Sequence, residues 1–206
     1  MYLLLPTPRH GFDPACSVTM ISSLFLIFLA TFLATSSSAL WPLPQQLSTG
    51  TTLLRLAPDF SVDLSGIHDA PQDLKDAVAR THDYLYTDKL QMLTPDRGAS
   101  IASAISHAQA LSKLTLSLGG PVTSISEEAI QDIDSRIEDY TLTVPADGDA
   151  AVLHANSTLG LFRGLTTFEQ LWYDWQGTTY TLQAPVNIAD KPTYVSGRIY
   201  THIYSR

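Results

Sequence analysis

The sequence predicts an α+β fold of the layered kind, in which a β-sheet carries two main helices on one of its faces. Segment 114–118 alternates leucine with threonine and serine, which is the period of a half-buried strand. Segments 140–144 and 151–155 look like two more strands around a turn, and segments 72–86 and 157–173 repeat apolar residues at helical spacing. Strands that share a sheet with two covering helices form a layered architecture.

Composition narrows the class of protein. The chain has 206 residues with 12 Lys+Arg against 20 Asp+Glu, a formal net charge of −8 that excludes a generic nucleic-acid binder. With 45% apolar and 16% charged residues, one compact domain is expected rather than a disordered chain or a fibre. The length also excludes a complete (β/α)8 barrel together with a second domain, because such a barrel alone takes about 250 residues. The single cysteine, Cys16, excludes an internal disulfide and a cysteine-ligated zinc site.

Residues 1–39 resemble a secretory signal peptide. An apolar run lies between Val18 and Ala34, and the small residues of segment 36–39 form a cleavage site after Ala39. A membrane anchor is the alternative, although the uninterrupted core of the run is much shorter than the roughly 20 residues that span a bilayer. We therefore expect a secreted protein. Translation from Met20 instead of Met1 stays open.

The first half of the mature chain is expected to begin extended and then to form strands and a helix. Alternating apolar residues predict short strands at Thr52–Leu56 and Phe60–Leu64. An amphipathic helix follows from Gln72 to about Tyr86, with Asp73 in its first turn, where the helix dipole favours an acid. Residues 89–112 predict a loop with a short helix.

The second half predicts a strand, a hairpin, a helix and a last strand. The strand of segment 114–118 ends at Gly119-Gly120-Pro121, and Tyr140–Val144 with Ala151–Ala155 forms the hairpin. The last strand is Thr179–Leu182, after which Pro185 and Pro192 restrict the chain.

The helix of residues 157–173 has the strongest pattern. Its apolar stripe is Leu161, Leu165, Phe168 and Trp172. Gly160 and Gly164 lie four residues apart and, having no side chains, would let a neighbouring backbone approach closely. Each costs about 1 kcal/mol of helix propensity, which packing must offset. A coincidental pair of glycines is the alternative.

A search for catalytic or metal-binding patterns assigns none. The chain contains no His-Glu-x-x-His, no phosphate-binding glycine loop and no Gly-x-Ser-x-Gly turn. Six acidic residues between positions 127 and 139 form a cluster that resembles a calcium-binding loop. An EF-hand, however, needs an oxygen ligand and a glycine at the positions that Arg136 and Ile137 occupy, so a solvated acidic face is expected. The cluster comprises Glu127, Glu128, Asp132, Asp134, Glu138 and Asp139. The histidines His68, His82, His107 and His154 lack ligand spacing.

Asn156-Ser157-Thr158 fits the acceptor pattern for N-linked glycans, and the predicted secretory route makes that pattern meaningful. The alternative interpretation is a helix N-cap, because an Asn or Ser side chain there accepts hydrogen bonds from free backbone N–H groups. The two interpretations are compatible if the sugar lies at an exposed helix start.

Several motifs together resemble the N-terminal domain of secreted fungal β-N-acetylhexosaminidases of glycoside hydrolase family 20. They are Trp41-Pro42-x-Pro44, segments 140–144 and 151–155, and the glycine-bearing run Gly160-Leu-Phe-Arg163-Gly164-Leu-Thr-Thr-Phe168-Glu-Gln170-Leu171. The resemblance covers about residues 40–194. It implies a zincin-like α/β module that packs against a following (β/α)8 barrel, which holds the chemistry.

The resemblance also implies a substrate class. Family members remove terminal N-acetylhexosamine from chitooligosaccharides and glycans by a substrate-assisted route, an exception to the two-carboxylate scheme. An Asp-Glu pair of the barrel orients the acetamido group and donates the proton, and no cofactor is implied. A homodimer of the full-length form stays open.

None of the barrel motifs can be placed on this chain. The family continues into an Arg-Gly-x-x-x-Asp-x-x-Arg pattern, whereas here the sequence after Tyr194 reads Val-Ser-Gly-Arg-Ile-Tyr. We therefore assign no catalytic, substrate-binding or metal-binding residue, and we expect the chain alone to be inactive. Residues 195–206 are interpreted as a non-homologous tail, either translated intron or a genuine short splice form.

The alternative function is a stand-alone secreted carbohydrate-binding or interaction module. Its binding platform would need exposed aromatic rings, and the clustered candidates are Trp172, Tyr173 and Trp175. The helical pattern buries Trp172, so only Tyr173 and Trp175 could face outward, and a structural role is the preferred interpretation for both. A domain that evolved to dock on a barrel is also expected to keep an uncovered apolar surface.

Overall fold

A computed structural model of the chain describes residues 40–87 and 96–191. The predicted signal peptide, both alternative start positions, Pro192 and the predicted tail of residues 195–206 lie outside the described residues. In the part that is described, no helix is both long and apolar enough to cross a membrane.

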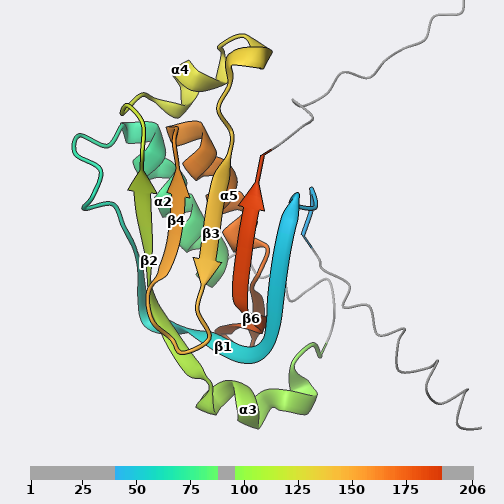
Figure 1. Cartoon of the computed structure of the whole chain (residues 1–206). Coiled ribbons are helices and arrows are strands. Elements are labelled where there is room, and N and C mark those ends of the chain that lie inside the picture. The colour runs from blue at the N-terminus through green and yellow to red at the C-terminus, as the bar shows by residue number, and fades with distance from the viewer. Residues whose placement is uncertain (1–39, 88–95, 192–206) are drawn as a thin grey trace, which may run out of the picture. The chain divides into compact units, whose positions relative to one another are not determined.

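The described residues form a mixed six-stranded sheet with the order β1-β2-β4-β3-β6-β5, and the two main helices α2 and α5 pack on one of its faces (Figure 1). The predicted α+β layer is therefore confirmed. The strands are β1 Gln46–Asp63, β2 Gln109–Leu118, β3 Tyr140–Val144, β4 Ala151–Ala155, β5 Tyr173–Trp175 and β6 Thr178–Asp190. The helices are α2 Gln72–Tyr86, α3 Ala102–His107, α4 Ile125–Ala129 and α5 Thr158–Glu169, with 3-10 turns η3 Ala99–Ile101 and η4 Ile133–Ser135.

Strand β1 replaces the two short strands that the sequence predicts at 52–56 and 60–64. It is one bent strand that pairs antiparallel with β6 through its first half and parallel with β2 through its second half. The register with β2 shifts between Leu56 and Ser61, so that Leu56, Ala57 and Phe60 are all buried. This irregularity interrupts the two-residue period and makes one strand look like two.

Strand β6 extends well past the predicted end at Leu182. Pro185 is tolerated because it lies where the pairing with β1 is irregular, between Thr52 opposite Ala184 and Thr49 opposite Val186. A proline there removes no regular ladder bond. Gly50 completes this site, since a Cβ on it would lie 2.4 Å from the Ala184 carbonyl oxygen.

The hairpin and the leucine-rich strand agree with the sequence prediction. Strands β3 and β4 pair antiparallel, with Leu142 opposite Leu153. Strand β2 runs parallel to β4 and starts at Gln109, directly after the short helix α3 that was expected in this region. The alternating leucines of β2 point to the helices, because Leu114 and Leu116 are buried.

The core lies between the sheet and the two main helices. Helix α2 has the predicted bounds and buries Leu74, Ala77, Thr81 and Leu85. Helix α5 starts at Thr158, one residue after the predicted start, and ends at Glu169, four residues before the predicted end. The chain turns there because Tyr173 pairs with Tyr180 in the sheet. Trp172 is buried from this turn, against the ring of Phe168.

Both glycines of α5 make close contacts, but only Gly160 meets a neighbouring backbone as predicted, whereas Gly164 meets a side chain. A Cβ on Gly160 would lie 2.6 Å from the Asp139 carbonyl oxygen, and one on Gly164 would lie 2.2 Å from Leu153 Cδ1. The helix therefore packs directly on the β3–β4 hairpin at these positions.

The sheet face opposite the helices carries mostly polar side chains, with Val152 of β4 as an exposed apolar residue beside Thr143. Its exposed side chains include Thr141 and Thr143 of β3 and Asn187 of β6. The large apolar side chains that are exposed in the described residues are Trp41, Leu43, Val122, Ile130, Ile137, Val152 and Leu182. Apart from Trp41 and Leu43, which share the extended start, they come from separate segments of the chain.

Candidate functional site

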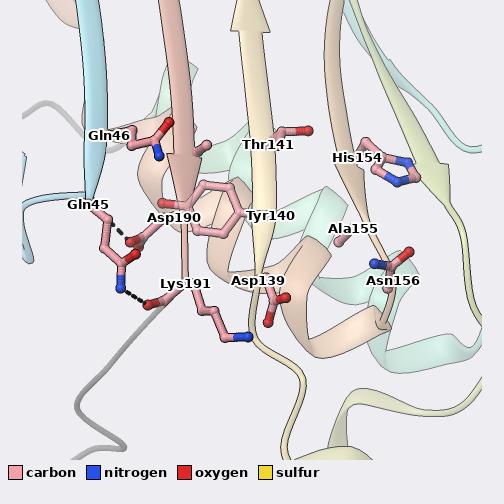
Figure 2. A pocket seen from close by; sticks show the side chains of 11 residues that line it. Gln45, Gln46, Asp139, Tyr140, Thr141, His154, Ala155, Asn156, Asp190 and Lys191 are labelled. Carbon is pink, nitrogen blue, oxygen red and sulfur yellow. Dashed lines mark hydrogen bonds between the residues drawn. The ribbon is translucent and has the colours of Figure 1, made fainter.

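A shallow groove of about 280 Å³ crosses one end of the open sheet face. Figure 2 shows its side chains, which come from the ends of four strands. The lining residues are Gln45, Gln46, Asp139, Tyr140, Thr141, His154, Ala155, Asn156, Ala189, Asp190 and Lys191.

Strand register brings these distant residues together. Thr141 lies opposite His154 on one side and opposite Ala189 on the other, and Ala189 lies opposite Gln46. Successive residues of a strand point to opposite faces. Thr141 is therefore exposed on the open face, while its neighbour Tyr140 is buried toward the helices.

Hydrogen bonds hold the rim and the floor of the groove. The Gln45 backbone N–H donates to Asp190 Oδ1 at 3.1 Å, and the Gln45 side-chain amide donates to the Lys191 carbonyl oxygen. The Tyr140 hydroxyl lies 2.6 Å from Thr167 Oγ1. Burial raises the pKa of the Tyr140 phenol to about 12, so this hydroxyl stays protonated.

His154 lies in the groove, but its surroundings are not those of a catalytic base. Its Nδ1 lies 3.2 Å from Ser117 Oγ, a neutral hydroxyl on the adjacent strand. A catalytic histidine is normally oriented by a group that also stabilises its charged form. The other three histidines that the sequence singled out are exposed and lie on separate elements, so the structure does not bring the four together.

The acidic cluster is only partly the solvated face that the sequence predicts, because Glu128 and Glu138 are buried. Glu128 Oε2 accepts hydrogen bonds from the Leu159 backbone N–H at 2.7 Å and from the Thr158 hydroxyl at 3.0 Å. Glu128 thus caps the first turn of α5, whose free N–H groups favour a negative charge.

Glu138 has a different partner on the same helix. Its Oε2 accepts a hydrogen bond from Arg163 Nε at 2.8 Å, and this ion pair joins α5 to the segment before β3. Glu127, Asp132 and Asp134 are exposed, as expected, and Asp139 is half-buried in the groove. Across residues 40–87 and 96–191, no three His, Cys, Asp or Glu side chains are arranged to hold a metal ion.

The aromatic candidates do not form an open platform. Trp172 is buried, as the sequence predicts, and Tyr173 and Trp175 are half-buried on β5 rather than outward on a helix. The Arg97 guanidinium covers the Tyr173 ring at 4.4 Å from its centroid. One face of the Tyr173 ring is therefore covered, and none of the three candidates is fully exposed.

Asn156 lies at the rim of the groove and is exposed, at the end of β4. Ser157 is the N-cap of α5, and its hydroxyl accepts a hydrogen bond from the Gly160 backbone N–H at 2.8 Å. The N-cap interpretation is thus confirmed for Ser157. The sequence did not indicate that Gly119 and Gly120 pack against Asn156, where a Cβ on Gly120 would lie 2.1 Å from the Asn156 carbonyl oxygen.

Comparison with known proteins gives one consistent result. A family described as beta-acetyl hexosaminidase like matches residues 40–171. The beta-hexosaminidase subunit beta of Felis catus is 33% identical over 166 residues, which cover 78% of this chain and 28% of that protein. The human protein of the same name is 34% identical over 161 residues, covering 76% of this chain and 26% of that protein.

The chain thus spans 28% and 26% of the length of these two relatives. Among solved structures, a chitobiase from Flavobacterium johnsoniae is similar with a TM-score of 0.50 and 20% identity, and the match covers 76% of this chain and 21% of that one. At this identity the likeness concerns the fold.

Proposed function

The chain belongs to the beta-acetyl hexosaminidase-like family, and from this premise we propose that it is the non-catalytic N-terminal domain of a β-N-acetylhexosaminidase. The complete enzyme would remove terminal N-acetylhexosamine from glycans and chitooligosaccharides. The chemistry would belong to a catalytic (β/α)8 barrel, and the present domain would act as the scaffold that packs against it.

One observation carries this proposal. The family match over residues 40–171 falls on the layered sheet and helices, and the buried acids of this region serve the packing of α5. Hydrolysis of a glycosidic bond needs an acid that protonates the glycosidic oxygen, and in the substrate-assisted route a second carboxylate that orients the attacking acetamido group at the anomeric carbon. In the described residues, Glu128 and Glu138 are instead occupied by the helix N-terminus and by Arg163.

An activity assay tests the proposal. We expect the purified chain to release no product from an aryl N-acetylglucosaminide, while cooperative unfolding in urea shows that it is folded. A complete β-N-acetylhexosaminidase serves as the positive control. Turnover by the folded chain would show that catalytic residues lie in this domain, contrary to the proposal.

Sequencing the mature transcript beyond the codon for Tyr194 is the complementary experiment, since a barrel-coding continuation is expected there.

The alternative of a carbohydrate-binding module gains no support from the aromatic residues. Trp172 is buried, Tyr173 is covered on one face by Arg97 and Trp175 is half-buried, so these three candidates do not form an exposed stacking platform. We expect no retention on chitin and no signal on a glycan array. Binding to either by the folded chain would favour the module function.

We also propose that the chain enters the secretory pathway and carries an N-linked glycan on Asn156. Support comes from the exposed side chain of Asn156 and from the predicted signal peptide. The acceptor pattern requires the Thr158 hydroxyl, which in the fold is buried and bonded to Glu128 and to the Thr123 carbonyl oxygen. Modification should therefore precede the folding of α5. Mass spectrometry of the secreted chain, with Asn156→Gln as control, tests for the glycan.

A further inference from the structure

We infer that the groove at the end of the open sheet face is a binding site for the chain's own N-linked glycan, whose first sugars lie across β3 toward the start of β1. The inference rests on the proposed modification of Asn156. It goes beyond that modification by naming where on the protein the attached glycan lies and in which direction it runs.

The position of Asn156 is the first argument. This residue is both the acceptor and part of the groove wall. Figure 2 shows its amide nitrogen, the atom that would carry the sugar, on the side of Ala155 and Asp139, with the amide oxygen turned away. On the oxygen side the Gly119 backbone closes in, since a Cβ on Gly119 would lie 2.5 Å from Asn156 Oδ1. A glycan attached here thus starts toward the groove.

The chemistry of the wall is the second argument. Gln46 offers an amide, Asp139 a carboxylate, Thr141 a hydroxyl and His154 an imidazole, all from one end of the open face. These are donors and acceptors that suit the hydroxyl and acetamido groups of sugars. The groove is shallow enough to remain open to solvent, as a chain of sugars with further branches requires.

The missing aromatic platform decides which sugar occupies the groove. Tyr140, the aromatic residue that lines it, is buried with its hydroxyl on Thr167, so no ring face is presented for stacking. A free oligosaccharide held only by exposed hydrogen bonds would bind weakly, because each bond replaces one to water. A tethered sugar has an effective concentration of about millimolar or more, which populates even a weak site. The groove therefore suits the attached glycan rather than a free one.

Nuclear magnetic resonance can locate the glycan on the wild-type chain. The isotope-labelled protein is secreted from a eukaryotic host, and its spectrum is recorded before and after endoglycosidase H trims the glycan to one sugar. We expect the amide signals of Gln46 and Thr141 to move and those of Thr143 and Asn187, on the same face but outside the groove, to stay. Changes confined to the immediate neighbours of Asn156 would overturn the inference.

A matched pair of variants gives a second readout. Native Gln46→Ala/Thr141→Ala protein should be trimmed by endoglycosidase H severalfold faster than wild type, because the glycan spends more time in solvent. The control Thr143→Ala removes an equally exposed threonine of β3 outside the groove and should be trimmed at the wild-type rate. Equal rates for all three proteins would contradict the inference.

Two further outcomes separate the possible failures. If mass spectrometry finds no glycan on Asn156, the proposed modification and the groove inference both fail, while the assignment as an N-terminal domain is untouched. If free chitooligosaccharide at micromolar concentration shifts the groove signals of Asn156→Gln protein, the groove is a site for free sugar and the tethered occupant is wrong.

Discussion

Glu128 and Glu138 have the same side chain as the exposed Glu127, yet only these two are buried. The difference lies in their partners, since a carboxylate leaves water at an acceptable cost only where donors replace the water molecules. The Leu159 N–H and the Arg163 guanidinium supply a donor to Oε2 of Glu128 and of Glu138, respectively, while the buried Oε1 of Glu138 has none among the described residues. Neither partner is adjacent in sequence, which is why the cluster looked like a solvated face.

Replacing Glu128 by alanine should lower the free energy of unfolding by about 2 kcal/mol, because the Leu159 N–H in the first turn of α5 loses its charged acceptor, while the Thr158 hydroxyl keeps the Thr123 carbonyl oxygen. Urea unfolding followed by tryptophan fluorescence measures the loss. Glu127→Ala, one residue earlier in the same short helix and exposed, is the control and should change stability by less than about 0.5 kcal/mol. Equal effects would show that the cap contributes nothing specific.

Glu169 makes stability depend on pH. Burial raises its pKa above the ordinary value of 4.5, although the Thr81 hydroxyl, 2.6 Å from Oε1, lowers it in part. A raised pKa in the folded state means that folding favours the protonated acid, so this stabilisation is complete below about pH 4.5 and is lost as pH rises through the raised value.

Glu169→Gln keeps an acceptor for Thr81 and removes the titration. Between about pH 4 and pH 7, wild type should therefore lose stability relative to this variant, and the variant should be the more stable protein at the upper end. Urea midpoints across this range provide the measurement. Parallel pH curves for the two proteins would contradict the assignment.

At the scale of elements, the contact of α5 with the β3–β4 hairpin depends on the two helix glycines. A Cβ added at each glycine would meet a different kind of group. Gly160 faces the Asp139 backbone carbonyl, whereas Gly164 faces the end of the Leu153 side chain. Backbone cannot give way without moving the strand, but a leucine can change rotamer. The same spacing that costs helix propensity thus produces two unequal contacts.

Gly160→Ala should destabilise the fold by about 3 kcal/mol and Gly164→Ala by about 1 to 2 kcal/mol, after the gain of about 1 kcal/mol in helix propensity. Denaturant titration of both variants tests the order. Gly66→Ala is a suitable control, since the nearest atom to its Cβ would be 3.9 Å away, the Leu116 carbonyl oxygen. A larger loss for Gly164→Ala would mean that Leu153 is as rigid as backbone.

At the scale of the whole molecule, segments from opposite ends of the described chain are joined. The Gln170 side chain at the end of α5 accepts a hydrogen bond from the Trp41 N–H at 2.7 Å and donates one to the Trp41 carbonyl oxygen at 3.1 Å. Gln45 makes a similar connection to Asp190 and Lys191. The extended start of the domain is therefore held by tertiary contacts rather than by its own local structure.

Gln170→Ala should cost about 1 to 2 kcal/mol, because both backbone groups of Trp41 lose their partner. Gln170→Glu keeps the acceptor and loses the donor, so an intermediate loss is expected. Gln131→Ala, at an exposed site, is the control. Thermal unfolding of the three variants measures the effects, and an unchanged melting temperature for Gln170→Ala would show that the first residues contribute no stability.

What the sequence determined by itself is the layered class, helix α2, the hairpin and the close backbone approach at Gly160, because each rests on a local period or on a residue whose conformational cost demands compensation. Tertiary structure alone decided that β1 is a single bent strand, that β6 continues through Pro185, and that α5 ends early. It also decided the groove, whose walls come from strand ends up to 146 residues apart, as Gln45 and Lys191 show. Register between distant strands sets such neighbours, and no local pattern encodes it.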